Sequence, residues 1–367
     1  MIPFGRIIGY GNIAPEKPKI VSYGASGQYV GFATNTGSVY VAGPAAISSF
    51  GQATNELSLL TQGVGHAWFS KVTNSVLVQR GSAYIQYGIY FKGGTYKDGK
   101  DITTDINNLM QLVPAGTTIK EIQVSPQLGV LLSNGDLYAI GVNTNQQLGT
   151  SESIVQTWRK IGESVIKYYM GANTTVMLSS SGSLYCCGSD YNGTLLGTNR
   201  TTFTRLTTDL VTEVYCIGLA NIRNIIFKTS TNTWKVTGSD TMGVGGTPAT
   251  ANSISNFTPA TAGFYPDGSG SNSEYVSTLI RDGKLYICGW NMFGQTGLGL
   301  GVSSNTITTS YTEVKNAINV QLTWAGTTTS YYVNADGELY GTGTGTSNLL
   351  PGYNRNSAVF VKLPLPF

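Results

Sequence analysis

The stretch Val130-Leu-Leu-Ser-Asn-Gly-Asp-Leu-Tyr-Ala-Ile140 has the pattern of two β-strands joined by a tight turn. Its Asn134-Gly135 dipeptide tolerates the positive φ angles of hairpin turns, and apolar residues that favour strands lie on both sides of it. The stretches that begin at Val176 and Tyr331 repeat the pattern. We therefore expect a strand–turn–strand unit at each of these places.

The same pattern occurs seven times along the chain. Each copy has a Gly, any residue, an apolar residue and an aromatic residue, followed by another Gly three or four positions later. The fifth copy, Asn232-Thr-Trp234, is the weakest because its leading Gly is absent. Repeats at intervals of 44 to 54 residues are typical of solenoids, propellers and arrays. The aromatic residues are Tyr40, Tyr84, Tyr138, Tyr185, Trp234, Tyr286 and Tyr340.

Each repeat carries two further strand signals outside its hairpin. One strand precedes the hairpin and ends near a Gly, as in Ile166 to Gly171 and Val320 to Gly326. A second Gly follows the hairpin by about eight residues and indicates a long turn to an outer strand. Four strands per repeat make one propeller blade, so we predict an all-β, seven-bladed β-propeller. The only helix expected is a short one over residues 104–112.

A family resemblance supports this fold. Gly289-Trp-Asn-Met-Phe-Gly-Gln-Thr-Gly-Leu-Gly299 and Gly141-Val-Asn-Thr-Asn-Gln-Gln-Leu-Gly149 resemble the signature of the regulator of chromosome condensation repeat. The resemblance covers roughly residues 21–367 and implies a seven-bladed propeller. The family includes nucleotide-exchange factors and many binding modules with no shared activity, so the resemblance implies no single function.

The two ends of the chain suggest how the ring closes. The run from Ile20 to Ala33 enters in mid-repeat, and the run from Ala358 to Phe367 is the strand that normally precedes such an entry. We predict that the last and first strands share one blade, which would remove exposed sheet edges. The predicted organisation is an arm and linker over residues 1–18 and a propeller over residues 19–367. The apolar arm either anchors the protein or lies over one propeller face.

Charge and hydropathy exclude several function classes. Charged residues make up only 11% of the chain, against about 25% in typical proteins, and the net charge is +3. This charge is too small and too scattered to bind nucleic acid or to form the charged face that nucleotide exchange on a small GTPase needs. We find no signal peptide and no apolar run of the roughly 20 residues that a membrane helix requires. We expect a protein made in a cytoplasm and not inserted in a membrane.

The residues suited to catalysis are few. His66 is the only histidine, and we expect it to be a structural strand residue near the central channel. Cys186, Cys187, Cys216 and Cys288 lie in apolar strands, which is typical of small buried side chains rather than metal ligands. The acidic stretch from Asp98 to Asp105 is interspersed with lysines and is expected to be a solvated loop. We therefore expect no enzyme activity, no metal and no cofactor.

Aromatic residues outside the repeat core are the remaining binding candidates, because Tyr and Trp supply large contact areas at low entropy cost. As a set on one propeller face, they could stack on sugar rings or anchor a protein. The candidates are Tyr96, Tyr191, Trp290, Phe293 and Tyr353.

Three hypotheses for the function remain. The Gly-, Ser-, Thr-, Asn- and Tyr-rich composition and the apolar arm favour a phage virion component, associated with a tail or capsid. Its arm and one face would contact other virion proteins, and the other face would bind a host glycan or protein or only decorate the particle. A cellular scaffold that binds a protein partner is the second hypothesis. A polysaccharide-degrading enzyme is the third, which the lack of a convergent acid pair disfavours.

Overall fold

In the computed structural model of the chain, residues 17–52, 56–190, 193–218, 222–239, 252–257, 273 and 275–367 are described. They form seven antiparallel sheets that follow one another along the sequence. Six of these sheets have four strands. In the sheet of the sixth repeat, the described residues supply three strands. The prediction of an all-β, seven-bladed β-propeller is confirmed.

Each blade is one continuous segment of the chain. Blades 1 to 4 are β1 (Ile20–Ala25), β2 (Val30–Thr34), β3 (Val39–Ala42) and β4 (Ser58–Thr61); β5 (His66–Phe69), β6 (Ser75–Arg80), β7 (Ala83–Ile89) and β8 (Thr95–Asp101); β9 (Ile119–Val124), β10 (Gln127–Leu132), β11 (Leu137–Val142) and β12 (Ile154–Gly162); and β13 (Val165–Met170), β14 (Thr174–Ser179), β15 (Leu184–Gly188) and β16 (Arg200–Arg205). Blades 5 to 7 are β17 (Val211–Ile217), β18 (Asn224–Thr229), β19 (Trp234–Gly238) and β20 (Ser255–Asn256); β21 (Val276–Arg281), β22 (Lys284–Trp290) and β23 (Ile307–Glu313); and β24 (Val320–Ala325), β25 (Thr329–Asn334), β26 (Leu339–Gly343) and β27 (Ser357–Lys362).

The hairpins form because their turn residues adopt positive φ angles. Gly135, at φ 85°, joins β10 to β11, and Asp282 and Gly283, at 50° and 70°, join β21 to β22. In the fifth repeat Asn232 takes this role with φ 64°, a conformation that Asn tolerates better than most residues. In the other repeats the aromatic residue follows the turn glycine by three positions. Three positions after Asn232 the chain has Lys235, not Trp234. The assignment of Trp234 to that position is therefore wrong.

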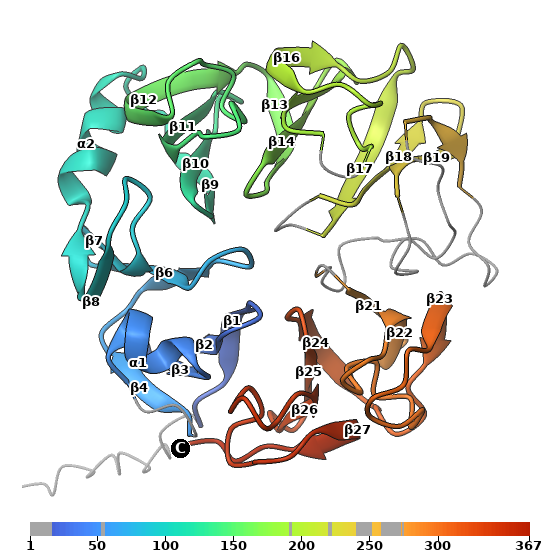
Figure 1. Cartoon of the computed structure of the whole chain (residues 1–367). Coiled ribbons are helices and arrows are strands. Elements are labelled where there is room, and N and C mark those ends of the chain that lie inside the picture. Colours follow the sequence, from blue (N-terminus) through green and yellow to red (C-terminus); the bar gives the residue numbers. More distant parts are fainter. Residues whose placement is uncertain are drawn as a thin grey trace, which may run out of the picture.

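The blades stand side by side in a ring (Figure 1). The first strands contact one another from blade to blade, as β1 does with β5 and β24, and β5 with β9. Because neighbouring strands run in opposite directions, each face of the ring carries its own set of connections. We call the face with the turns between second and third strands the hairpin face. The opposite face, with the loops between third and fourth strands, is the loop face.

The hydrophobic core lies between the blades rather than within them. One cluster joins blades 1 and 2 through Tyr29, Phe50 and Val76, and another joins blades 6 and 7. Similar clusters join blades 2 and 3, blades 3 and 4, and blades 4 and 5. Both faces of a propeller sheet are therefore covered by its neighbours, and burial on both sides explains the apolar runs of the second and third strands.

The ring closes by side-chain packing and not by a shared blade. β27 pairs with β26 of the last repeat, whereas β1 pairs with β2, so the predicted shared blade is wrong. Blade 1 needs no strand from the C-terminus because the segment that begins at Ile20 already supplies four. Tyr23 stacks on Trp324 across the junction, with ring centroids 4.6 Å apart. The C-terminal Phe367 ring lies 5.9 Å from that of Tyr40.

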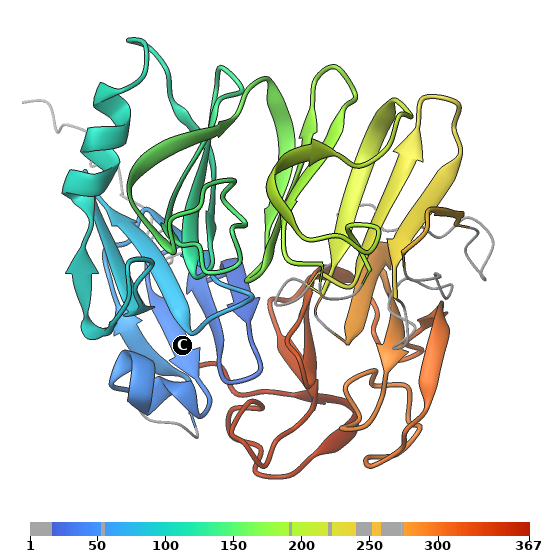
Figure 2. The ribbon, with the colours of Figure 1, turned by 45° about the horizontal axis from the view of Figure 1, so that its top comes forward.

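Two helices interrupt the strands. α2 (Thr103–Gln111) confirms the predicted helix, and α1 (Ala45–Phe50) was not anticipated. In Figures 1 and 2, α2 lies at the outer rim of the ring between blades 2 and 3. The expected acidic loop is wrong, because Asp98 and Asp101 belong to β8 and Asp105 to α2.

The predicted N-terminal arm lies outside the described residues as far as residue 16. No helix within the described ranges is long and apolar enough to cross a membrane.

Candidate binding groove between blades 2 and 3

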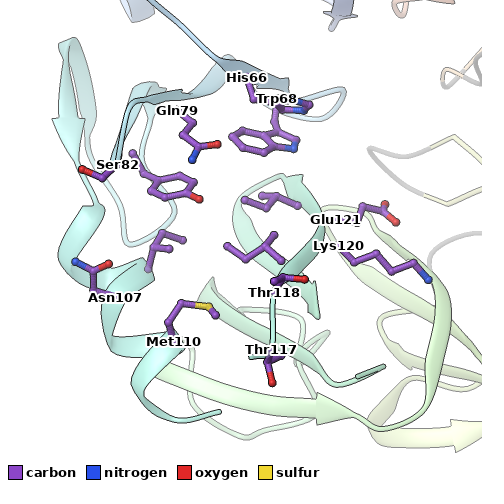
Figure 3. Close-up of a pocket in the computed structure, with 14 residues that line it drawn as sticks. His66, Trp68, Gln79, Ser82, Asn107, Met110, Thr117, Thr118, Lys120 and Glu121 are labelled. Atoms are coloured by element: carbon purple, nitrogen blue, oxygen red, sulfur yellow. The ribbon is translucent and has the colours of Figure 1, made fainter. Parts of the chain in front are cut away.

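A groove of about 600 Å³ lies on the hairpin face between blades 2 and 3 (Figure 3). Blade 2 supplies one wall, and α2 with the start of β9 supplies the other. The lining combines aromatic rings, amides, hydroxyls and aliphatic side chains. This size and mixture are typical of sites for small molecules or for a segment of a larger partner.

The blade 2 wall arises from strand register. His66 in β5 pairs with Gln79 in β6, which pairs with Tyr84 in β7, so the three side chains lie in one row on one face of the sheet. Trp68, two residues after His66, shares that face. The Trp68 ring centroid lies 4.3 Å from that of His66 and 6.3 Å from that of Tyr84. The planes of Trp68 and Tyr84 differ by only 23°, so these residues form a nearly parallel aromatic wall with an amide beside it.

Helix α2 is anchored to both blades. Trp158 of blade 3 donates a hydrogen bond from its Nε1 to the backbone oxygen of Asp105 at 2.6 Å. Lys92 of blade 2 forms a 2.7 Å ion pair with the Asp105 carboxylate. Asn107 and Met110, three residues apart, lie on the helix face that borders the groove. The packing of the fold therefore sets the distance between the two walls.

The lining carries no net charge at neutral pH. Lys120 and Glu121, at the start of β9, have opposite charges. The Glu121 carboxylate accepts a 2.7 Å hydrogen bond from the Gln123 amide. Partial desolvation lowers the pKa of the exposed His66 side chain below 6.5 and raises the pKa of the half-buried Tyr84 above 10, so both side chains are neutral at pH 7. The groove is therefore suited to a ligand without a strong charge.

Titration of His66 should show this lowered pKa directly. Because His66 is the only histidine, its C2 proton gives a unique signal in the proton NMR spectrum. We expect a midpoint below 6.5 in the folded protein and a midpoint near 6.5 in urea. Between these values the unfolded chain binds more protons, so the free energy of unfolding should fall as the pH is lowered through that window. A folded-state midpoint at or above 6.5 would contradict the desolvation of His66.

The aromatic candidates chosen from the sequence do not form one site. Tyr96, at the start of β8, packs edge-on against Tyr90 in blade 2. Tyr353 contacts Arg355 in the last loop of blade 7. Trp290 and Phe293 belong to blade 6, on the opposite side of the ring from Tyr96 (Figure 1). Tyr191 lies outside the described residues.

Trp290 and Phe293 do lie together, with ring centroids 6.3 Å apart. Tyr275 also packs edge-on against Trp290, with ring centroids 5.2 Å apart. The Trp290 indole donates a hydrogen bond to Asn305 at 3.1 Å, and the neighbouring Met292 is 39% exposed. These residues form a small aromatic surface on the loop face, which we call the blade 6 surface.

The four cysteines are buried, as predicted, and all are free thiols. Burial raises the pKa of Cys186 to about 12, so its thiol stays protonated at neutral pH. Across the described ranges, no three His, Cys, Asp or Glu residues are grouped to hold a metal ion.

Sequence reasoning missed the groove. It treated Tyr84 only as the aromatic residue of the second repeat, gave Trp68 no role and placed His66 at a structural position, although the His66 side chain is exposed. One signal was present: the interval of 54 residues between Tyr84 and Tyr138 is among the longest, and it contains the segment that forms α2.

Solved structures with the same architecture are known. No family model and no curated protein sequence matches the chain. Among solved structures, the chain is similar to yeast RCC1 (Prp20) bound to Kap60, with a TM-score of 0.67 and 14% identity over 86% of this chain and 79% of that chain. This chain has the fold of RCC1-like propellers.

Two further solved structures, a second one of Prp20 and one of a human protein, agree with this result. Prp20p from Saccharomyces cerevisiae matches with a TM-score of 0.66 and 14% identity over 86% of this chain and 81% of that chain. Human WBSCR16 matches with a TM-score of 0.60 and 14% identity over 85% of this chain and 86% of that chain. At this level of identity the likeness concerns the fold alone.

Proposed function

We propose that the chain is a non-catalytic binding propeller whose partner occupies the groove between blades 2 and 3. The wall formed by His66, Trp68, Gln79 and Tyr84 carries this proposal. Aromatic rings that are only partly buried offer a large contact area with little loss of side-chain entropy, and an adjacent amide fixes the orientation of a partner. Other propellers of this fold bind proteins: yeast RCC1 was solved bound to Kap60.

The environment of the titratable groups favours binding over catalysis. A general base needs a positioned proton donor or acceptor within hydrogen-bond reach. His66 instead lies against the Trp68 ring, and Glu121 accepts its hydrogen bond from Gln123. The carboxylate of Asp105 pairs with Lys92 outside the groove lining. In these contacts His66, Glu121 and Asp105 meet a ring, an amide and an ammonium group rather than a serine or threonine hydroxyl.

Single alanine substitutions test where the partner binds. A partner would first be recovered on the immobilised wild-type protein and identified by mass spectrometry, and its affinity for purified variants then measured by calorimetry. Trp68→Ala and Tyr84→Ala should each weaken binding about tenfold, because each removes a large contact surface. Trp290→Ala on the blade 6 surface is the matched control and should change affinity less than twofold.

The opposite pattern would refute the proposal. If Trp290→Ala and Phe293→Ala weaken binding while both groove variants bind normally, the blade 6 surface is the binding site. Turnover of a polysaccharide, or release of nucleotide from a GTPase, that persists in highly purified protein would contradict a non-catalytic function.

A finer proposal concerns the biological setting. The low charge and the Gly-, Ser-, Thr-, Asn- and Tyr-rich composition favour a component of a phage virion over a cellular scaffold. In a virion, the chain would occur in purified particles at a fixed ratio to the major structural protein, which quantitative mass spectrometry measures. Its absence from such particles would favour the cellular scaffold.

A further inference from the structure

We propose that the ligand of the groove is a neutral oligosaccharide, held with sugar rings against Trp68 and Tyr84 and with hydroxyl groups on the amides of Gln79 and Asn107. This inference rests on the proposed function, because it assigns a ligand class to the same groove. Three properties of the groove carry it.

The first property is the shape of the aromatic wall. The Trp68 and Tyr84 rings are tilted by only 23° from each other, with centroids 6.3 Å apart, and both are partly exposed. Both residues line the groove, and Figure 3 shows the Trp68 ring beside the space between its two walls. The C–H groups on one face of a pyranose ring are apolar and weakly positive, and an aromatic face carries negative charge density. A partly exposed aromatic ring in the lining therefore offers a face on which a sugar ring can stack.

The second property is the kind of polar group that the groove offers. Gln79 lies in the same row as His66 and Tyr84, and Asn107 extends from α2 on the other wall. An amide has two donor hydrogens and an acceptor oxygen, so it can bond to two neighbouring hydroxyls at once. Thr117 and Thr118, just before β9, also line the groove and add hydroxyl groups. Amides on both walls therefore match a ligand rich in hydroxyl groups.

The third property is charge. Lys120 and Glu121 oppose each other in sign, and His66 is neutral at pH 7. Strong binding of a carboxylate, sulfate or phosphate requires clustered Arg or Lys side chains, and the described lining has one Lys beside one Glu. An acidic sugar or a highly charged peptide would bury charge without a partner. A volume of about 600 Å³ is enough for a ligand of drug size, such as a short oligosaccharide.

The test is a titration of the full chain with a panel of neutral trisaccharides: maltotriose, cellotriose, mannotriose and tri-N-acetylchitotriose. The C2 proton of His66 reports occupancy by NMR, and calorimetry measures affinity. We expect at least one trisaccharide to shift the His66 signal to saturation. Trp68→Ala should weaken its binding about tenfold, and Trp68→Phe should retain most of it because the ring remains. Gln79→Ala should weaken binding with unchanged thermal stability.

The control is Trp290→Ala, which should bind the same sugar normally. If no neutral trisaccharide shifts the His66 signal at millimolar concentration, or if sugar binding survives both Trp68→Ala and Gln79→Ala, the saccharide assignment is wrong. If sugars fail while a recovered protein partner still loses affinity on Trp68→Ala, the groove remains the binding site and its ligand is a peptide segment. If that partner also ignores Trp68→Ala, the proposed function fails as well.

Discussion

Replacing Trp324 with alanine should lower the free energy of unfolding by about 3–5 kcal/mol, the range for removing a large aromatic side chain from a core. Trp324 is fully buried and is stacked between Tyr23 of blade 1 and Tyr331 of blade 7, with centroid distances of 4.6 and 5.2 Å. It therefore lies at the junction where the first and last blades meet. The resulting cavity would weaken the junction that closes the ring.

Denaturant unfolding monitored by circular dichroism measures this effect, and two variants serve as controls. Trp324→Phe should cost clearly less than Trp324→Ala, because it keeps a ring and removes an indole nitrogen that has no hydrogen-bond partner in the described structure. Trp290→Ala should cost less than about 1 kcal/mol, because Trp290 is partly exposed. A cost below about 1 kcal/mol for Trp324→Ala would show that the stacked rings do not hold the closure.

The comparison of closure with the hairpins shows what a sequence can predict here. A hairpin depends on a few adjacent residues, so Gly135 and Asp282-Gly283 marked their turns reliably. The number of blades followed from counting such turns. Closure depends instead on where the chain enters its first blade. Both candidate end strands have ordinary strand sequences, and only their pairing with β2 and β26 distinguishes the two arrangements.

The binding groove could not be predicted from the sequence for a related reason. His66, Gln79 and Tyr84 lie in three different strands and share no local sequence motif. Only the register of β5, β6 and β7 brings them into one row. Trp290 and Phe293, by contrast, are neighbours in a recognisable motif, so the sequence could place them together. Local patterns thus identified the blade 6 surface, whereas the groove required the pairing of strands and the position of α2.

The close approach of blades 3 and 4 gives the second large effect, at Gly129 in the middle of β10. A Cβ atom at this position would lie 2.1 Å from Met170 Sδ and 3.0 Å from a ring carbon of Tyr168, both in blade 4. The Tyr168 hydroxyl also donates a 2.9 Å hydrogen bond to the Gly129 carbonyl oxygen. Tyr168 and Met170 are buried, so neither has free space to move into. Gly129→Val should therefore lower the free energy of unfolding by about 2–3 kcal/mol.

The same denaturant experiment checks this prediction, and the structure supplies a matched control and a rescue. Gly65→Ala places its Cβ in ordinary contact, 3.8 Å from the backbone oxygen of Gln79, and should change stability by less than about 0.5 kcal/mol. Met170→Ala should recover part of the loss in the Gly129→Val background, because it removes the sulfur that the new side chain meets. If Gly129→Val is as stable as the wild type, the blades can separate at this interface without loss. In that case β10 would accept a larger side chain at position 129, and the packing of blade 3 against blade 4 would not require a glycine there.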